Sequence, residues 1–309
     1  MLILDYLLKE IRINNNKRDE KDMKRNYPSL FSSLKWFYAE KSVIYILLFT
    51  YLFITILPLV WVFSTSLKSN EEATSIPPQF IPKNPTLENY LFVITEPHIV
   101  KSLLNSFLVG IGSTIISVGV SALGGYAFAR FKFKGKNILL SIVLGLFMIP
   151  VLINIIPLYI MFSQIGLLNS IIGLILIFQI LIIPLNIFLL KSYFETIPKE
   201  LEEAALIDGC SNLGVLRRIT IPLSMPGFAI AAVLAFRFSW NEFILPIVLS
   251  NSPDSMVFQV ALYEFVSLYR IEWGYLTAGI NIALVPILVL MLIFQRQMIQ
   301  GLTIGAIRH

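Results

Sequence analysis

Residues 191–226 read KSYFETIPKELEEAALIDGCSNLGVLRRITIPLSMP and form a polar connection between two long apolar stretches of the chain. Pro198 suits the first turn of a helix, because the N–H that proline lacks has no partner there in any case. Three glutamates follow, and their charges complement the positive end of a helix dipole: Glu200, Glu202 and Glu203. The segment therefore predicts a short helix that begins near Pro198.

The same segment carries signals for a sharp turn and a second helix. Gly209 can adopt the left-handed conformation that ends a helix. Ser211 or Asn212 can cap the helix that follows, and Pro222 ends it. We therefore expect two short helices joined by a turn.

A small apolar patch on the first helix consists of Leu201, Ala204 and Ala205. In water such a patch favours a protein partner, and alanine side chains permit that partner to approach closely. The patch can equally pack on the chain's own helices. The residues alone leave both interpretations open.

The composition indicates an integral membrane protein. The chain has 309 residues, of which 56% are hydrophobic and only 14% are charged, and its mean hydropathy is +0.77. Soluble domains are nearer a quarter charged, so lipid must cover part of this apolar surface. The single cysteine, Cys210, excludes an internal disulfide and a cysteine-rich metal site, and two histidines are too few for a histidine cluster.

Six apolar stretches are long enough to cross a bilayer as helices, which takes about 20 residues each: residues 43–63, 102–129, 137–162, 170–190, 227–250 and 275–294. Prolines and glycines within them are tolerable, because neighbouring helices can satisfy the freed backbone groups. The run VGIGSTIISVGVSALGGYAFA at residues 109–129 has many small side chains and permits a neighbouring helix to approach closely. These features predict an all-α bundle of six transmembrane helices.

Lys and Arg residues are unevenly divided between the two sides of this predicted bundle. Nineteen lie in residues 1–41, in the second–third and fourth–fifth connections and at the C-terminal end, against four in the loops of the other side. Because positive charge marks cytoplasmic loops, both termini are predicted to be cytoplasmic. Residues 1–41 would form a cytoplasmic tail, in which residues 2–7 could make an amphipathic surface helix, and residues 42–309 would form the transmembrane domain.

One spaced motif resembles that of a known family. Residues 203–205 are Glu-Ala-Ala, Gly209 follows after three residues, and residues 219–222, Ile-Thr-Ile-Pro, follow after nine more. This order is similar to the signature of inner-membrane permease subunits of binding-protein-dependent ABC importers. Its single departure is Ile221, where the pattern has leucine, and that exchange conserves volume.

Two further stretches look like the carbohydrate-uptake branch of that family, the second permease of maltose-type importers. They are SWNEF at residues 239–243 and the ending FQRQMIQGLTIGAIRH at residues 294–309. The resemblance implies a type I ABC importer permease fold with a cytoplasmic coupling helix. Its core would be residues 100–298, and residues 191–226 would be the coupling loop.

The resemblance implies a transport subunit rather than an enzyme. Such a permease forms a path for a sugar or oligosaccharide with a second, homologous permease, in the cytoplasmic membrane of a bacterium or archaeon. Two ATPase subunits bind ATP and Mg²⁺ and drive it, and an extracytoplasmic solute-binding protein delivers the substrate. No nucleic-acid partner is implied.

The chain itself is not expected to hydrolyse ATP. It lacks a G-x-x-x-x-G-K-[ST] phosphate loop, since Gly135-Lys136 is followed by Asn137 and the earlier glycine is absent. We therefore expect no catalytic residue, cofactor or metal in this chain.

The resemblance assigns the first helix of the coupling loop to contact with the ATPase. The residues that would form this coupling helix are Glu203, Ala204, Ala205, Leu206, Asp208 and Gly209. Arg217 and Arg218 in the following helix could contact either the ATPase or the lipid surface.

Polar side chains within residues 227–250 are a second group of candidates. A charge at membrane depth costs at least about 2.5–3.5 kcal/mol, so such residues usually face a cavity or a partner. Arg237 and Asn241 lie four positions apart on one helix face, and Glu242 follows. With Trp240 they could line the translocation path, where an aromatic ring and an amide suit a sugar. An interface or ion pair with the neighbouring subunit is the alternative.

The outer loop at residues 251–274 is the remaining candidate site. It carries aromatic and acidic side chains and is predicted to contact the binding protein through Tyr263, Ser267, Tyr269 and Trp273. Four amides in other spans are further candidates, and each is predicted to form a helix–helix hydrogen bond in preference to a contact with substrate: Asn154, Gln179, Asn186 and Asn281.

An ion- or proton-coupled secondary transporter is the main alternative. Such proteins often show inverted repeats and several intramembrane carboxylates. This sequence shows no convincing repeat and one such carboxylate, Glu242. A scaffold without transport would leave the coupling loop unexplained.

Overall fold

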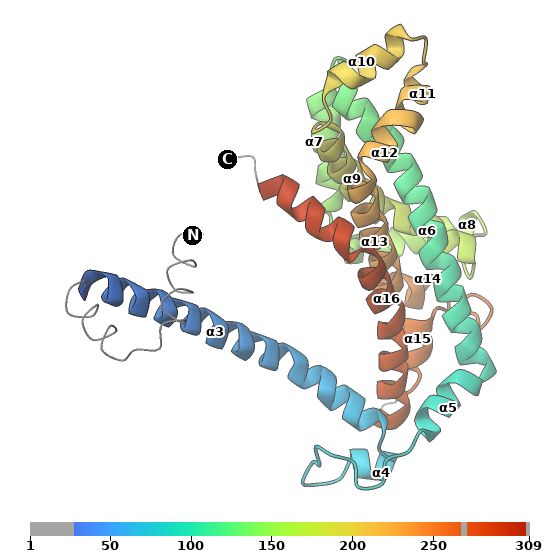
Figure 1. The fold of residues 1–309 in the computed structure, drawn as a ribbon. Coiled ribbons are helices and arrows are strands. Elements are labelled where there is room, and N and C mark those ends of the chain that lie inside the picture. Colours follow the sequence, from blue (N-terminus) through green and yellow to red (C-terminus); the bar gives the residue numbers. More distant parts are fainter. Residues whose placement is uncertain (1–27, 267–270, 307–309) are drawn as a thin grey trace. The chain divides into compact units, whose positions relative to one another are not determined.

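The computed structural model describes residues 28–266 and 271–306 of the chain (Figure 1). The chain divides into two compact units, Met1–Trp61 and Val62–His309. The described ranges are dominated by helices and contain no strand beyond one isolated bridge. The predicted all-α class is therefore confirmed.

The helix α3, Pro28–Ser66, makes up the described part of the first unit and reaches into the second. Its residues Ser42–Ser66 are long and apolar enough to span a membrane, as predicted for residues 43–63. The helix begins earlier than that stretch, so residues 28–41 of the predicted tail are helical. The amphipathic helix predicted at residues 2–7 lies outside the described residues.

Four helices form the body of the second unit (Figure 1): α6 (Pro97–Arg130), α9 (Ile171–Phe194), α13 (Met225–Asn241) and α16 (Trp273–Ala306). The helix α6 packs along both α9 and α13, and α13 also packs along α16. One apolar core joins α6, α9 and α13 and includes Val109, Phe178 and Ala235. A second core joins α16 to α6 and includes Ile99 and Ala278.

Small residues in α6 permit this close packing. A methyl group on Gly125 would lie 3.0 Å from the backbone nitrogen of Lys191, and one on Gly110 would lie 2.8 Å from the ring of Phe236 on α13. Gly119 faces open space instead. The small-residue run therefore allows two neighbours, α9 and α13, to approach α6.

Two of the six predicted spans are broken into shorter helices. The described residues hold four helices long and apolar enough to cross a membrane, or up to six spans if each bent helix pair counts as one. Residues 137–162 form α7 (Lys136–Phe147), the 3-10 turn η1 (Val151–Asn154) and α8 (Ile155–Gln164), and the chain bends by 85° at the break. The break falls at Pro150, which lacks the N–H that a continuous helix needs.

Residues 227–250 likewise form two helices, α13 and α14 (Ile244–Leu249). The carboxylate of Glu242 accepts hydrogen bonds from the backbone N–H groups of Ile244 (3.1 Å) and Leu245 (3.3 Å). A side chain thus satisfies the first donors of α14, so a new helix begins here.

Short elements close the two ends of the second unit (Figure 1). One end, which we name the α10 end, holds α10 (Lys199–Ile207), α11 (Asn212–Val215), the π-turn η2 (Leu216–Thr220) and α12 (Ile221–Leu223). The opposite end, the α4 end, holds α4 (Asn70–Ala73), α5 (Glu88–Thr95) and α15 (Phe258–Tyr263). The helical segment from α11 to α12 meets α13 at 84°.

Amide side chains join helices of the second unit, as predicted. Asn186 donates to a carbonyl of α13 (3.4 Å) and Gln179 donates to a carbonyl of α6 (3.5 Å). Asn281 on α16 donates to a tyrosine hydroxyl on α5 (2.9 Å). These three helix–helix hydrogen bonds confirm the prediction for Gln179, Asn186 and Asn281. The Asn154 side chain forms no such bond with another described residue.

Candidate functional site

The coupling loop begins with a helix whose end is fixed by glycine. Pro198 directly precedes α10, as predicted, and Gly209 beyond its end has a φ of +88°. The N–H of Gly209 donates to Leu206 O (3.1 Å), and that of Cys210 donates to Ala205 O (2.9 Å). This is a Schellman arrangement, which satisfies the last carbonyls of a helix.

The second helix of the loop also follows the prediction. Ser211 caps α11 by accepting a hydrogen bond from a backbone N–H of that helix (3.2 Å). The helical path continues through η2 and α12 and ends at Leu223, directly after Pro222. Arg217 and Arg218 on η2 are exposed. The predicted helix, turn and second helix are therefore confirmed.

The helix α10 has a buried face and an exposed face. Glu202 and Ala205 lie on the buried face, whereas Ile207 at the tip is 86% exposed. The other predicted coupling residues are all exposed: Glu203, Ala204, Leu206, Asp208 and Gly209. The predicted apolar patch is therefore divided, because Ala205 packs on the chain's own helices while Leu201 and Ala204 remain exposed.

Glu202 joins α10 to two other elements through a buried ion pair. Its carboxylate accepts hydrogen bonds from Nε (2.7 Å) and Nη2 (3.0 Å) of Arg130 at the end of α6. The two side chains are only 6% and 8% exposed. Thr220 Oγ1 on η2 donates to the same carboxylate (2.8 Å), and Arg130 Nη2 also donates to Ile197 O (3.1 Å). One carboxylate therefore holds α6, α10 and η2 together.

The sequence does not predict this pair. By position alone, Glu202 complements a helix dipole and Arg130 belongs to a basic connection between two spans. The residues lie 72 positions apart, so no local spacing links them. The one available signal is that Glu202 precedes Ala205 by three positions, which places both on one helix face.

The residues predicted at the end of α13 face different surroundings. Trp240 is buried; its Nε1 donates to a carbonyl of α16 (3.0 Å), and its ring stacks on Phe236 with centroids 5.4 Å apart. Arg237 and Asn241 are exposed. Arg237 forms no ion pair with any described residue, and Glu242 is engaged by the start of α14. The four side chains therefore do not form one cluster.

Asn241 borders a hollow of about 420 Å³ between α13, α15 and α16. Gln259 and Tyr263 also line it, as does Phe243, whose ring centroid lies 5.3 Å from that of Tyr263. The Asn241 amide and the Tyr263 hydroxyl donate to no other residue in the described part of the chain. Free polar groups beside aromatic rings suit a ligand that has both hydroxyl groups and apolar faces.

The predicted outer-loop site is described in part. Tyr263 and Trp273 are 51% and 40% exposed and flank a segment closed by an isolated antiparallel bridge. Ser267 and Tyr269 lie outside the described residues. The structure places Tyr263 both beside this loop and at the hollow.

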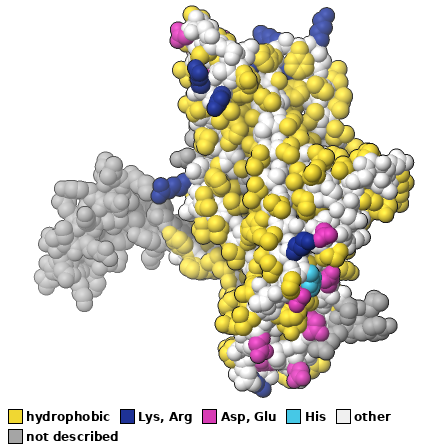
Figure 2. Space-filling view, turned by 90° about the vertical axis from the view of Figure 1, so that its right-hand side faces the viewer, with side chains coloured by type: hydrophobic (Ala, Val, Ile, Leu, Met, Phe, Trp, Pro, Cys, Tyr) yellow, Lys and Arg dark blue, Asp and Glu magenta, His cyan; other side chains and the backbone are white. Residues whose placement is uncertain are grey.

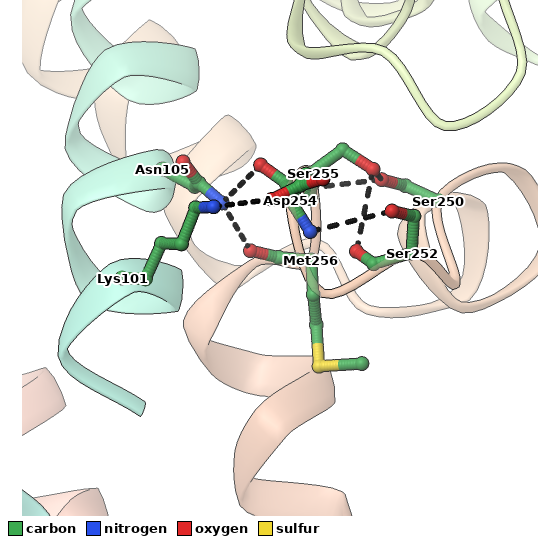
Figure 3. A network of polar contacts seen from close by, with 7 residues as sticks. All are labelled: Lys101, Asn105, Ser250, Ser252, Asp254, Ser255 and Met256. Atoms are coloured by element: carbon green, nitrogen blue, oxygen red, sulfur yellow. Dashed lines mark hydrogen bonds and ion pairs between the residues drawn. The ribbon is translucent and has the colours of Figure 1, made fainter. Parts of the chain in front are cut away.

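A polar network ties the first turns of α6 to the turn between α14 and α15 (Figure 3). Asn105 Nδ2 donates to the carbonyls of Asp254 (3.0 Å) and Met256 (2.9 Å). The Lys101 ammonium hydrogen-bonds and attracts the Asp254 carboxylate, which holds the pKa of that group below its usual value of 3.8. Serine side chains add hydrogen bonds within the turn. The network therefore fixes α6 to residues 250–256.

Opposite charges gather at the two ends of the second unit. Figure 2 shows Lys and Arg side chains concentrated at the α10 end and most of the visible Asp and Glu side chains at the α4 end. In residues 28–266 and 271–306, no group of three His, Cys, Asp or Glu side chains could hold a metal ion.

Comparison with known sequences identifies the family. The family described as binding-protein-dependent transport system inner membrane component matches residues 121–303. The chain is 33% identical over 275 residues to the sulfoquinovosyl glycerol transport system permease protein SmoH of Agrobacterium fabrum, covering 89% of this chain and 96% of that protein. It is 35% identical over 255 residues to the trehalose transport system permease protein SugB of Mycobacterium tuberculosis, covering 82% and 92% respectively.

Solved structures share the fold. A bacterial ABC transporter involved in the import of the acidic polysaccharide alginate has a chain that matches with a TM-score of 0.72 at 22% identity, over 83% of this chain and 95% of that one. A bacterial alginate transporter in complex with an alginate pentasaccharide-bound periplasmic protein matches with a TM-score of 0.58 at 17% identity, over 89% and 94%. The chain therefore belongs to the family of binding-protein-dependent transport system inner membrane components, as a multi-pass permease subunit of an ABC importer.

Proposed function

We propose that this permease imports a sugar or oligosaccharide together with a second, homologous permease subunit. Two ATPase subunits, which bind ATP and Mg²⁺, drive the transport, and an extracytoplasmic solute-binding protein delivers the substrate. The names of the relatives support a carbohydrate, since they refer to sulfoquinovosyl glycerol and trehalose. The binding protein is supported by the alginate transporter that holds a periplasmic protein.

The exposed face of α10 is the observation that carries this proposal. Ile207 presents most of its apolar surface away from the bundle, and charged side chains lie beside it, as in a surface that docks a protein. The residues proposed to contact the ATPase are those of this face: Glu203, Ala204, Leu206 and Asp208. Ala205 supports the helix from behind, and Gly209 shapes its end. Arg217 and Arg218 lie close enough in the chain to meet the ATPase or the lipid surface.

The charge asymmetry supports an orientation with the α10 end in the cytoplasm, because basic loops remain on that side. Both termini then lie in the cytoplasm, with residues 1–41 as a tail. The membrane is the cytoplasmic membrane of a bacterium or archaeon.

The hollow beside Asn241 is the proposed point of contact with the sugar. Its amide and the Tyr263 hydroxyl can pair with sugar hydroxyls, and the aromatic rings can cover apolar sugar faces. Arg237 and Glu242 flank this part of the translocation path. Trp240 positions the end of α13 through its hydrogen bond to α16.

The outer loop is the proposed contact for the binding protein. The residues proposed for this contact are Tyr263, Ser267, Tyr269 and Trp273. Of these, Tyr263 and Trp273 lie in the described ranges, in α15 and at the start of α16, toward the end that would face outward. Exposure of Tyr263 and Trp273 supports this role.

Purification followed by reconstitution tests the proposal. The tagged chain should copurify with a second permease and an ATPase. The ligand carried by the cognate binding protein identifies the sugar, which vesicles holding the complex should accumulate only when binding protein and ATP are both present. Accumulation that needs an ion gradient and no ATP would support a secondary transporter instead.

A further inference from the structure

The helix α6 connects the two ends of the second unit. It has 34 residues and its only proline is Pro97, in the first turn. At a rise of 1.5 Å per residue it is about 50 Å long, and no proline interrupts its backbone hydrogen bonds. Arg130 at one end holds Glu202 of α10, and Asn105 at the other end holds the turn at residues 250–256 (Figure 3).

We infer that Glu202 and Arg130 are positioning residues that make α6 move together with the coupling helix, and that α6 carries this movement to the turn at residues 250–256. The inference rests on the proposed function, in which an ATPase moves α10. It adds the route by which that movement reaches the opposite end of the bundle.

The ion pair of Glu202 and Arg130, which we call the joint between α10 and α6, resists separation because it is buried and bidentate. Pulling the Glu202 carboxylate away from Arg130 would leave two buried charges without the opposite charge that compensates each, which costs far more than breaking a surface pair. Within the described ranges, α10 forms no other ion pair. A displaced α10 therefore takes the end of α6 with it instead of sliding across it.

The opposite end of α6 is held as closely. Asn105 is 6% exposed and bonds two carbonyls of the turn. Next to it, Ser106 accepts a hydrogen bond from the N–H of Phe258 at the start of α15 (2.7 Å). Because α15 ends at Tyr263, which lines the hollow, a shift of α6 displaces one wall of the proposed sugar contact.

Three variants test this route in the complete complex, reconstituted with its partner permease, ATPases and binding protein. Glu202→Gln keeps the side-chain shape and removes the charge at the joint, and Asn105→Leu removes the hydrogen bonds at the other end. Glu195→Gln is the matched control, because it breaks an ion pair with Lys191 (2.9 Å) that lies within one helix end. Uptake and ATP hydrolysis are measured on the same vesicles, with copurification of the ATPase as the test of assembly.

Glu202→Gln and Asn105→Leu should each lower the solute taken up per ATP hydrolysed by roughly 5–150-fold, the usual range for coupling between sites. Because both act on one route, the double variant should fall little further than the worse single variant. The control should match the wild type, and every variant should still copurify with the ATPase.

A probe on the turn gives a readout that a merely structural role would not change. In a Cys210→Ser background, a spin label at Asn251→Cys, an exposed position, should change its mobility when ATP is added. The change should persist with Glu195→Gln and vanish with Glu202→Gln or Asn105→Leu. Should Glu202→Gln fail to assemble, Asn105→Leu decides the question, since it lies far from α10 in the chain.

If Glu202→Gln takes up as much solute per ATP as the wild type, the proposed role of the joint is wrong. If Asn105→Leu does so, the proposed route through α6 is wrong. Fully additive losses in the double variant would also contradict a single route. A wild-type complex that binds no ATPase, or that takes up solute without ATP, would overturn the proposed function instead.

Discussion

At the scale of single residues, Gly209 shows how one backbone angle directs the coupling loop. Its φ of +88° is left-handed, which costs a side chain such as valine about 1–3 kcal/mol. No atom lies within 4 Å of the place where a Cβ would sit, so crowding adds nothing to that cost. Gly209→Val should therefore distort the end of α10 and lower ATP-driven uptake by the reconstituted complex, with membrane insertion unchanged.

Gly209→Asn is the matched control for this prediction. Asparagine visits the left-handed region far more readily than other side chains, and the same open space receives it. Its uptake should stay near that of the wild type. Equal losses in both variants would show that any side chain is harmful at this position, whatever its backbone preference.

The ion pair of Lys101 and Asp254 makes the stability of the contact between α6 and the turn depend on pH in the acid range. The folded pKa of Asp254 lies below 3.8, so its contribution to stability is complete above that value and is lost only as the pH falls through the lowered pKa. The difference in melting temperature between wild type and Asp254→Asn should be constant from neutral pH to about pH 4 and shrink below it. A difference that already shrinks near about pH 6 would assign the effect to another group.

Residue roles that depend on the local backbone could be predicted, and those that depend on distant partners could not. Gly209 and Ser211 act on groups within a few positions, where turn and cap chemistry is known. Glu202 acts on Arg130, 72 positions away. The place of Trp240 between α13 and α16 is also decided by packing, so its sequence neighbours Asn241 and Glu242 gave no indication of it.

At the scale of elements, the contact of α6 with α9 depends on Gly125. An added methyl would lie 3.0 Å from the backbone nitrogen of Lys191 and 3.3 Å from the carbonyl oxygen of Ile187, and backbone atoms cannot turn aside. Gly125→Ala should therefore lower the free energy of unfolding by about 1–3 kcal/mol, as overpacking does. Thermal unfolding of the purified protein in detergent measures this loss.

Gly119→Ala provides the control on the same helix. Gly119 faces open space, and alanine is the better helix former by up to about 1 kcal/mol. This variant should be as stable as the wild type or more stable. A comparable loss in both variants would place the cause in α6 itself rather than in its contact with α9.

The lengths of the elements could be predicted better than their breaks. The sequence of an apolar stretch such as residues 137–162 does not show where its helix bends, because lipid and protein neighbours are equally apolar. Proline alone does not locate a break either, since Pro150 ends a helix whereas Pro184 lies within the continuous α9. The break after Asn241 depends on Glu242, whose carboxylate accepts hydrogen bonds from the start of α14. In the sequence, the charge of Glu242 indicates only a group at membrane depth.

At the scale of the whole molecule, the sequence predicts the membrane class because that class depends on the composition of the whole chain. It predicts the family because the motif is a long pattern with fixed spacing. The hollow could not be predicted, because its lining comes from α13, α15 and α16, which the chain brings together only on folding. Of its lining residues, Asn241 was predicted for the translocation path, since an amide within an apolar stretch needs a partner or a cavity, whereas Tyr263 was predicted for the outer loop.

The hollow leads to a prediction for the complete transporter. If Tyr263 bonds a sugar hydroxyl, Tyr263→Phe removes one net hydrogen bond of about 1 kcal/mol. Uptake at saturating loaded binding protein should then fall roughly fivefold, while stimulation of the ATPase by the binding protein is unchanged. Unchanged stimulation matters because Tyr263 also borders the outer loop.

Tyr159→Phe on α8 is the control, because this tyrosine is 44% exposed and does not line the hollow. Tyr159→Phe should leave uptake and the stimulation of the ATPase by the binding protein at the wild-type level. Equal uptake by the two variants would remove Tyr263 from the sugar contact. If Tyr263→Phe instead abolishes stimulation of the ATPase, its hydroxyl acts on the binding protein, and the sugar must be held by Asn241 and the partner permease without it.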